Sequence, residues 1–568
     1  MPDKEIIAYA RGEKPVDLLV KNIKLVNVLS GEIYEESVAV ANGLVVGFGD
    51  YEADVIIDGE GKYLAPALID GHIHIESSHL SPSEFCEVVA AHGTGAVVSD
   101  PHEIANALGV EGIDYMVEET EDLPVAVYYQ VPSCVPATHM ENAGATLTAD
   151  DIEMMWNRYP HRLPGLAEVM NVPGVLFGDE GVHAKLQAAE DEGRIIDGHS
   201  PLLRGKDLSA YICAGPKNDH ESTDPDEGLE KLRKGMHLLM REGSSEHNMK
   251  DLLPVLNDYN SQNISFISDD RHASDLLNKG HMDHSVRTAI AEGVPALRAI
   301  QMASINTARH FGLDGHGAVA PNYRADFVLL NDLDTFDIHE VFLSGAPVSQ
   351  LSFEPETRAK VENTMNVAKI SADTFAMPEG EGKIRVIGLI ENQILTEHLE
   401  LDPKMEGARP VADEERDILK LAVLERHHGS GNCGLGFVQG LGLKNGALAS
   451  SYAHDSHNLI VAGTSDANME LAAKHCVKIG GGFVAVQDGK VIAELPLPIA
   501  GMMSDKPAAE VVKGLDALHG ACHEMGSPLA DPFMALSFLS LPVIPSLRVT
   551  DMGLVDVNKF DFTDVFVK

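Results

Sequence analysis

Residues 64–76, LAPALIDGHIHIE, decide the fold. A short apolar run ends in His72 and His74, which are two positions apart. Side chains alternate across a β-strand, so both imidazoles point the same way and can reach one cation. An isolated His-x-His pair is a weak signal, but this one closes an apolar strand pattern. We therefore expect residues 64–76 to form the first strand of a metal-binding barrel.

Seven further stretches have the same form, a short run of strand-forming residues that ends in polar ones. They are GAVVSDPHE (95–103), AVYYQVPS (126–133), LPGLAEVMN (163–171), RIIDGHSP (194–201), NDHES (218–222), HLLMREGS (237–244) and ISFISDD (264–270). Helix-like segments separate them. Eight strand–helix units over roughly 210 residues are typical of a (β/α)8 TIM-type barrel. The sixth stretch, short and polar, is the least strand-like.

The flanks of this region predict two further domains in an α/β protein. Residues 1–62 read as short strands punctuated by Ser-Gly and Asn-Gly turns, and residues 315–375 contain a second β segment. We expect these two parts to form one small β domain around a barrel at 63–314. Residues 376–568 have their own apolar content and predict a C-terminal α+β domain.

Composition narrows the class of protein. Lys and Arg total 43 against 87 Asp and Glu, a net charge of −44. Such a surface repels phosphates and anionic lipids, so we expect neither nucleic acid nor membrane as a partner, but a small-molecule substrate. The six cysteines form no CxxC pair, and no signal-peptide or membrane-spanning run is evident. We expect a cytoplasmic protein.

Histidines and carboxylates end five of the eight strands. They are His72, His74, Glu168, His199, His220 and Asp269. Any one could be a core histidine or a solvated acid, but together they match a site for two divalent cations. Such a pair would produce a metal-activated hydroxide near neutral pH. Glu168 is the candidate bridge, and Asp269 is both a ligand and the candidate base.

A second acid must protonate the substrate ring or the leaving nitrogen. Glu221 is the candidate because it follows His220 directly. The alternative is that Glu221 only holds a histidine in one tautomer. The residues alone do not decide between these roles.

Several longer stretches resemble the adenine deaminase family of the amidohydrolase superfamily. They include GHIHIESSHLSPSEF, VVSDPHEIANALGVEGI, VPSCVPATHMENAGA, DGHSPLLRGKDLSAYICAG, SDDRHASDLLNKGHMDH and LPLPIAGMMSD. The resemblance covers nearly the whole chain. One departure is Asn322, where many relatives have glycine in a tight turn; Asn tolerates the left-handed conformation, so we expect the turn to survive.

The resemblance implies hydrolytic deamination of free adenine to hypoxanthine and ammonia. It also implies a binuclear centre of manganese or iron(II), held by the six residues above. We predict substrate-binding side chains within the family-like stretches, at Ser77, His102, Glu103, Asp270 and His457. We further expect a homo-oligomer.

Three other classes of protein fit this pattern less well. Hydantoinase-like enzymes share the barrel but bridge their metals with a carboxylated lysine, and the nearest lysine to Glu168 is Lys185, inside a helix-like segment. Zinc cytidine-type deaminases need an HxE…PCxxC signature, which is absent. A scaffold that has lost its metals should lack several ligands, whereas here none is missing.

The C-terminal region has two histidine motifs, ERHHGSGNCGLGF (425–437) and AHDSHN (453–458). They could be turn residues of a β-rich fold, an extra metal site, or loops that cover the barrel mouth. A small planar substrate needs a cover that excludes water. We therefore expect at least one motif to lie near the metals.

Overall fold

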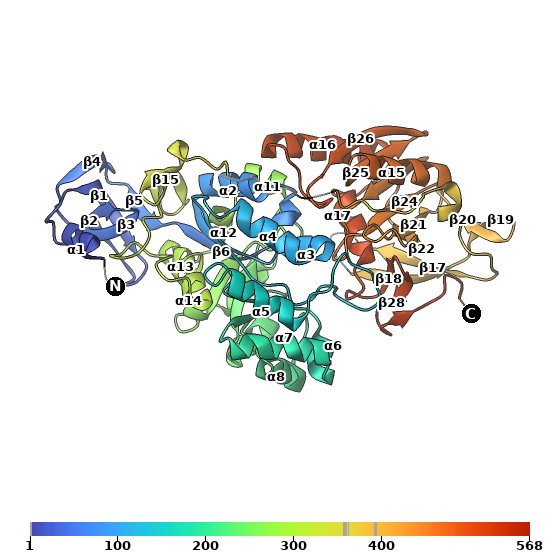
Figure 1. Ribbon diagram of the computed structural model, residues 1–568, viewed down its shortest axis with the longest axis horizontal. Helices are drawn as coiled ribbons and strands as arrows, with labels where there is room; N and C mark the ends of the chain where they lie inside the picture. Colours follow the sequence, from blue (N-terminus) through green and yellow to red (C-terminus); the bar gives the residue numbers. More distant parts are fainter. Residues whose placement is uncertain (1–2, 356–360, 362, 391–392, 394, 568) are drawn as a thin grey trace.

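The computed structural model describes residues 3–567, apart from 356–360, 362, 391–392 and 394. A small β domain containing the N-terminus lies at one end, the barrel in the middle, and a C-terminal domain at the other end (Figure 1). Strand labels below follow that figure.

The barrel strands are short and almost wholly buried. In the described chain they are β6 (Leu68–Ile73), β7 (Thr94–Ser99), β8 (Ala126–Tyr129), β9 (Gly165–Val169), β10 (Ile195–Gly198), β11 (Asn218–Asp219), β12 (His237–Arg241) and β13 (Ile264–Ile267). Parallel strands covered by helices are apolar on both faces, which explains the continuous Val, Ile and Leu runs. The sixth strand has two residues, in line with its weak sequence pattern.

Backbone hydrogen bonds close these strands into a ring. Three parallel ladders, β6-β7-β8, β9-β10 and β11-β12-β13, are joined by isolated bridges and short-range backbone hydrogen bonds. The bridges Val131↔Leu166 and Ile73↔Asp269 join β8 to β9 and β13 to β6. The amide of Lys217 donates to the carbonyl of Ile196 at 2.9 Å, between β10 and β11. The expected TIM-type barrel is confirmed.

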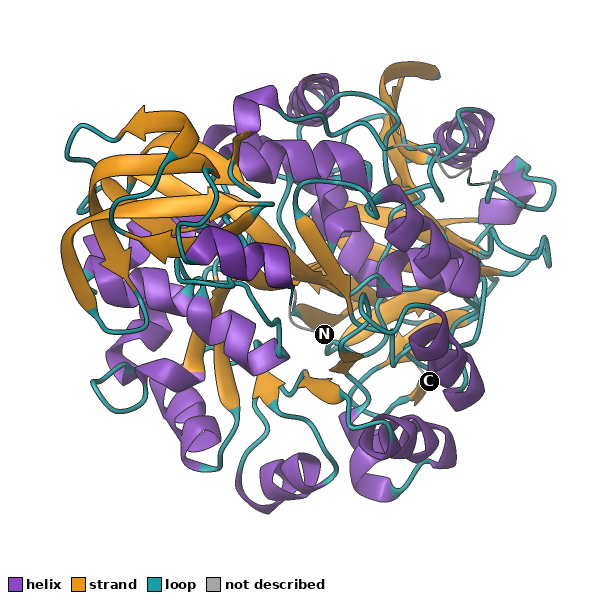
Figure 2. Ribbon diagram, turned by 60° about the vertical axis from the view of Figure 1, so that its left-hand side comes forward, coloured by secondary structure: helices purple, strands orange, loops and turns teal. Residues whose placement is uncertain are grey.

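Helices surround the ring (Figure 2). The first, α2, begins with Ser81 as N-cap, whose hydroxyl accepts from the amide of Glu84, and with Pro82 in the first turn. The barrel helices are α2 (Pro82–Ala91), α3 (His102–Leu108), α4 (Val110–Glu119), α5 (Ala149–Arg158), α6 (Val172–Phe177), α7 (Glu180–Asp191), α8 (Gly205–Cys213), α9 (Pro225–Arg233), α10 (Met249–Leu252), α11 (Ala273–Asn278), α12 (Met282–Ala291), α13 (Ala296–Met302) and α14 (Ile305–Phe311).

The small β domain combines both flanks of the barrel, as expected. Its sheet has the order β16-β15-β14-β5-β1-β2-β3, with β4 paired to β1. The elements are α1 (Lys4–Ala10), β1 (Val16–Asn27), β2 (Glu32–Ala41), β3 (Leu44–Phe48), β4 (Ala53–Asp58), β5 (Tyr63–Pro66), β14 (Phe327–Asp332), β15 (Asp337–Leu343) and β16 (Ala346–Pro347). Residues 63–66 therefore belong to this sheet, and the first barrel strand starts at Leu68. Asn322 has a φ of 70°, the left-handed conformation expected for its turn.

The C-terminal domain is α+β, built on a sheet of order β18-β17-β22-β21-β24-β23-β25-β26. Its elements are β17 (Ile384–Leu389), β18 (Thr396–Leu401), β19 (Lys404–Glu406), β20 (Arg409–Val411), β21 (Ile418–Leu424), β22 (Cys433–Gln439), β23 (Gly446–Ser450), β24 (Leu459–Gly463), α15 (Asp466–Lys478), β25 (Gly482–Gln487), β26 (Lys490–Pro496), α16 (Ala508–Glu524), α17 (Pro532–Ser537), β27 (Leu547–Thr550), β28 (Gly553–Asp556) and β29 (Asp561–Phe562). Buried Met469, Ala472 and Cys476 of α15 pack in one core with this sheet.

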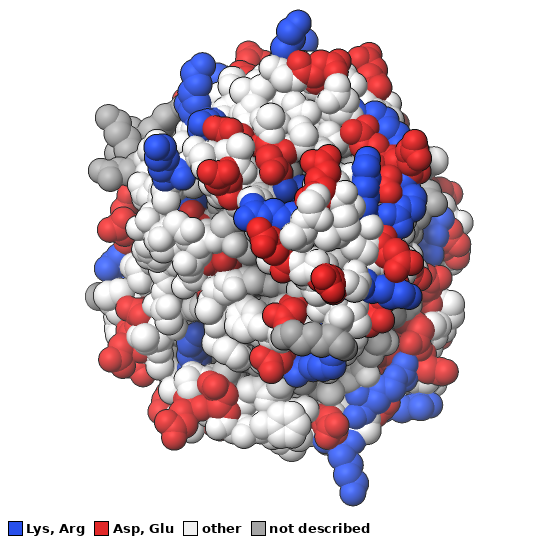
Figure 3. Space-filling model, turned by 90° about the vertical axis from the view of Figure 1, so that its right-hand side faces the viewer, with Lys and Arg blue, Asp and Glu red and all other residues white. Residues whose placement is uncertain are grey.

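Acidic and basic side chains are interspersed on the face of the molecule that Figure 3 shows, and no large basic patch is seen there. All six cysteines are free thiols. Within the residues that the structure describes, no helix has the length and apolar character needed to cross a bilayer.

A buried lysine ties together the strand ends that carry two of the predicted ligands. Lys231 Nζ lies 2.7 Å from Asp219 Oδ2 and 2.8 Å from Glu227 Oε1, and all three side chains are fully buried. The same ammonium donates to the carbonyl of Ser200 at 2.8 Å. Ser200 follows His199 and Asp219 precedes His220, so this cation holds both loops in place.

We predict that Lys231→Ala costs about 3–5 kcal/mol of unfolding free energy, because it leaves two buried carboxylates without their cation. Denaturant titration measures this loss. The control is Lys234→Ala, which removes a partly exposed pair with Glu230, 2.9 Å long, and should cost less than about 1 kcal/mol. Equal losses in the two variants would contradict the role of Lys231.

Candidate metal centre and substrate site

All six predicted ligands meet at the carboxyl ends of the barrel strands. His72 is the penultimate residue of β6 and His74 directly follows that strand, while Glu168 lies in β9. His199 and His220 come directly after β10 and β11, and Asp269 comes two residues after the end of β13. In a TIM-type barrel this face carries function. Five of the six side chains are buried, and the side chain of His199 is 23% exposed. The open side of the site is therefore at His199.

One half of the cluster is built around Asp269. Its Oδ1 lies 3.4 Å from His72 Nε2 and 3.2 Å from His74 Nε2. His74 Nδ1 donates to the carbonyl of Asp100 at 2.9 Å, which leaves the Nε2 lone pair facing the carboxylate. The three side chains thus converge on one point.

Glu168 joins this half to the other. Its Oε1 lies 3.6 Å from His74 Nε2. Its Oε2 lies 2.6 Å from His199 Nδ1 and 3.1 Å from His220 Nε2. One carboxylate therefore faces a different set of imidazoles with each oxygen, which is the arrangement that a bridging ligand needs.

These spacings fit divalent cations. Ligand atoms about 2.1 Å from a metal lie about 3–3.5 Å from one another, close to the separations here. Among the described residues His72 Nε2 and His220 Nδ1 are buried polar atoms with no hydrogen-bond partner. Burial lowers the pKa of His72. Despite burial, the pKa values of His74, His199 and His220 are raised by neighbouring carboxylates, so metal binding would release the protons on these three. The donor set therefore suits a binuclear centre.

A lysine bridge finds no support in the geometry. Lys185, in α7, donates to the carbonyl of Ser133 at 2.6 Å. Glu168, by contrast, belongs to two groups of His, Asp and Glu side chains that are close enough together to hold a metal. The geometry therefore favours Glu168 rather than Lys185 as the bridge.

Two of the predicted substrate residues lie against the C-terminal domain. The Ser77 hydroxyl donates to Asp270 Oδ1 and lies 2.8 Å from the Tyr452 hydroxyl. Tyr452 is buried and precedes the AHDSHN motif. Residues 375 positions apart thus share one hydrogen-bond network.

The other three predicted substrate residues, His102, Glu103 and His457, form a second network. Both oxygens of Glu103 are taken by the AHDSHN motif: His454 Nδ1 lies 2.8 Å from Oε1, and His457 Nε2 donates to Oε2. The amide of Ala453 donates to His457 Nδ1 at 3.1 Å, which fixes that tautomer. These contacts hold the C-terminal domain against the first turn of α3, the helix that follows β7.

His102 connects this network to the metal ligands. Its Nδ1 lies 3.6 Å from Glu168 Oε1 and 3.2 Å from Asp100 Oδ2. Its Nε2 lies 3.7 Å from Glu103 Oε1 and 4.0 Å from Asp455 Oδ1. One imidazole therefore separates the AHDSHN motif from the ligand cluster, and the motif lies at the barrel mouth.

The ERHHGSGNCGLGF motif supports the other motif. The Arg426 guanidinium donates to the carbonyls of His457 and Ala500, and His427 Nε2 donates to the carbonyl of Ser456 at 2.7 Å. These are loop-shaping contacts, consistent with turn residues of a β-rich fold.

Comparisons with known proteins agree with this architecture. Residues 63–348 match the Amidohydrolase family, and residues 393–561 match the adenine deaminase C-terminal domain. An adenine deaminase of Oleidesulfovibrio alaskensis is 55% identical over 562 residues, 99% of this chain and 98% of the relative. The chain belongs to the adenine deaminase family. A second member, from Desulfatibacillum aliphaticivorans, is 48% identical over the full length of both chains.

Among solved structures, the chain is similar to that of N-acetyl-D-glucosamine-6-phosphate deacetylase from Mycobacterium smegmatis. It aligns with 58% of this adenine deaminase family chain and 99% of its own, at a TM-score of 0.45 and 16% identity.

Sequence reasoning missed several polar residues at this site. Asp100 directly follows the second barrel strand and Arg241 ends the seventh, so a strand-end position was an available signal for both, although arginine is not a metal ligand. Tyr452 reaches the site from another domain. His454 and Asp455 belong to the AHDSHN motif that was expected near the metals, but their individual contacts were not predicted. Arg241 contacts both Asp269 and Glu221.

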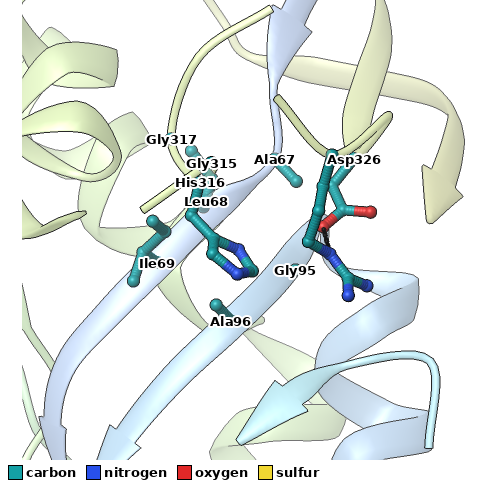
Figure 4. A pocket seen from close by; sticks show the side chains of 10 residues that line it. Ala67, Leu68, Ile69, Gly95, Ala96, Gly315, His316, Gly317 and Asp326 are labelled. Carbon is teal, nitrogen blue, oxygen red and sulfur yellow. Dashed lines mark hydrogen bonds and ion pairs between the residues drawn. The ribbon is translucent and has the colours of Figure 1, made fainter. Parts of the chain in front are cut away.

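A small cavity elsewhere in the barrel is not part of this site. It lies at the amino ends of β6 and β7 (Figure 4), opposite the ligand cluster. Its wall includes Leu68, Ala96, His316 and the ion pair Arg324–Asp326, whose Nε–Oδ2 distance is 2.8 Å. That end of a TIM-type barrel contributes stability rather than chemistry.

We predict that Glu168→Gln lowers the bound metal from about two equivalents to one or fewer, because the bridging anion is lost. Metal analysis of the purified protein checks this, and turnover should fall with the metal. Glu180→Gln, the same change on an exposed helix end, is the control. Two retained equivalents and near-normal turnover would show that Glu168 is not the bridge.

Proposed function

We propose that this member of the adenine deaminase family hydrolyses free adenine to hypoxanthine and ammonia. The observation that carries the proposal is Glu168, placed between two sets of imidazoles in a complete six-ligand cluster. A scaffold protein would have no reason to bury such a cluster without its cations.

Two divalent cations, manganese or iron(II), are the proposed cofactors. His72, His74 and Asp269 would hold one, His199 and His220 the other, and Glu168 both. When bound, they lower the pKa of a water so that it attacks carbon near neutral pH. Imidazole and carboxylate ligands together suit both metals.

The carboxylates beside the cluster move the protons. Asp269 is the base, and Glu221 delivers a proton to N1 of adenine. Burial raises the pKa of Glu221, but the neighbouring positive charges, the Arg241 guanidinium first, lower it by more than that. Its pKa therefore lies below the ordinary value, and Glu221 is ionised before the reaction. The attacking water therefore supplies both protons. One passes through Glu221 to N1, and the other passes through Asp269 to the amine that leaves C6 as ammonia.

The C-terminal domain covers the substrate in this proposal. Ser77 and Asp270, with His102, Glu103 and His457, form the polar wall that contacts the purine. Contacts from Tyr452, His454 and His457 hold that wall against the barrel mouth. A closed site excludes water and strengthens the electrostatic interactions inside it.

The setting of the enzyme follows from its surface and thiols. Six free cysteines suit the reducing cytoplasm, and we place the enzyme there. We also expect a homo-oligomer, a property that light scattering measures directly. The acidic surface leaves small molecules, rather than nucleic acid, as the partners.

We predict that the manganese-loaded enzyme releases ammonia from adenine, and that adenosine, cytosine, guanine and cyclic amides are poor substrates. Ammonia detection across these compounds makes the comparison. Asp269→Asn should reduce turnover by at least about 100-fold, because the base and a ligand are lost together. No ammonia from adenine with two metals bound would overturn the proposed reaction.

A second prediction concerns the cover. His457→Ala removes one of two imidazoles on Glu103, a charged hydrogen bond whose loss corresponds to about a tenfold effect or more. We expect a higher KM or a lower kcat with unchanged metal content. His523→Ala, an exposed histidine of α16, is the control. Normal kinetics for His457→Ala would remove this motif from the site.

A further inference from the structure

Arg241 is a buried arginine at the barrel mouth that binds no substrate or metal in the scheme above. It is the last residue of β12, and its relative exposure is 4%. A fully charged side chain at this depth needs partners for every N–H group.

The guanidinium contacts both carboxylates that transfer protons. Nη1 donates to Asp269 Oδ2 at 2.6 Å and to Glu221 Oε1, and Nη2 donates to Glu221 Oε2 at 3.3 Å. Asp269 directs its other oxygen, Oδ1, toward His72 and His74. The two oxygens of Asp269 therefore have different partners: Oδ2 binds Arg241, and Oδ1 faces the metal-ligand imidazoles. Arg241 thus fixes which oxygen is directed toward the proposed cation site.

Asn248 holds the guanidinium from behind. Its side-chain Oδ1 accepts from Arg241 Nε at 3.1 Å and from Nη2 at 3.0 Å. The backbone N–H of Asn248 donates to the backbone carbonyl of Arg241 at 3.1 Å. With these contacts all five N–H donors of Arg241 are engaged. The guanidinium cannot rotate without breaking several charged hydrogen bonds.

We infer that Arg241 is a positioning residue that sets the spacing and orientation of Asp269 and Glu221 at the barrel mouth. The inference rests on the proton-transfer roles proposed for these two carboxylates. A planar guanidinium contacts two carboxylates at once in fixed directions, whereas a lysine ammonium is a point charge that cannot reproduce the fork. Misplacement of a reacting group by about 1 Å can reduce rates about 100-fold.

The test uses the metal-loaded, full-length enzyme and three variants. Arg241→Ala should lower kcat about 100-fold while KM stays within about threefold and both metal equivalents remain. Arg241→Lys should recover only a minor part of kcat, because it restores the charge but not the geometry. Added guanidinium should restore activity to Arg241→Ala, whereas added methylammonium should not.

Asn248→Ala provides an independent check if Arg241→Ala does not fold. It keeps the guanidinium but removes its anchor, so we expect an intermediate fall in kcat with normal metal content. Arg233→Ala, an exposed arginine of α9, is the control.

The outcomes separate two kinds of failure. A wild-type enzyme that releases no ammonia from adenine would refute the proposed function. An active wild type with normal kcat in Arg241→Ala, or full recovery in Arg241→Lys, would refute only the positioning role. The positioning role alone would also be refuted if activity fell only because metal was lost, or if only KM rose.

Discussion

The rest of the site depends on one buried carboxylate, Glu168, which must face two sets of imidazoles at once. Burying an ionised carboxylate costs several kcal/mol unless opposite charge surrounds it. His199 and His220 lower its pKa despite burial, and cations bound among the ligands would supply more positive charge. Four strands, β6, β9, β10 and β11, must therefore end at one level. Only a closed barrel with a fixed register brings ends so far apart in sequence to a single point.

That constraint extends to the residues that hold the strand ends. Lys231 anchors the loops after β10 and β11 from within the protein, and Arg241 connects the ends of β11, β12 and β13 at the mouth. Each is a buried cation among carboxylates. In a chain of net charge −44, such cations are scarce inside, and both stand where acids would otherwise repel one another. The acidic composition is thus compatible with a tightly packed ligand cluster, because Lys231 and Arg241 lie where neighbouring carboxylates would otherwise repel one another.

Much of the architecture could be predicted from the sequence, because apolar runs that end in polar residues record strand direction. The rule that strands end at one face turned six scattered residues into one cluster, and it works because the barrel is built from local units. It did not yield Arg241, since an arginine at a strand end has no metal-ligand signature. Nor could it pair Glu103 with His457, which are 354 positions apart. Contacts between domains follow from how separate units pack, and no periodic pattern encodes that.

The C-terminal domain is therefore an integral part of the site rather than an appendage. His102 and Glu103 open helix α3, which follows β7, yet both oxygens of Glu103 are satisfied by histidines from the other domain. Without them the buried carboxylate of Glu103 would lie near the acids Glu76 and Asp455 and would lose the imidazoles on both its oxygens, which is a costly arrangement. His102 touches Glu168 on one side and Asp455 on the other, so the cover and the ligands share an imidazole. A displacement of the C-terminal domain would therefore disturb an imidazole that also contacts Glu168, the candidate bridge.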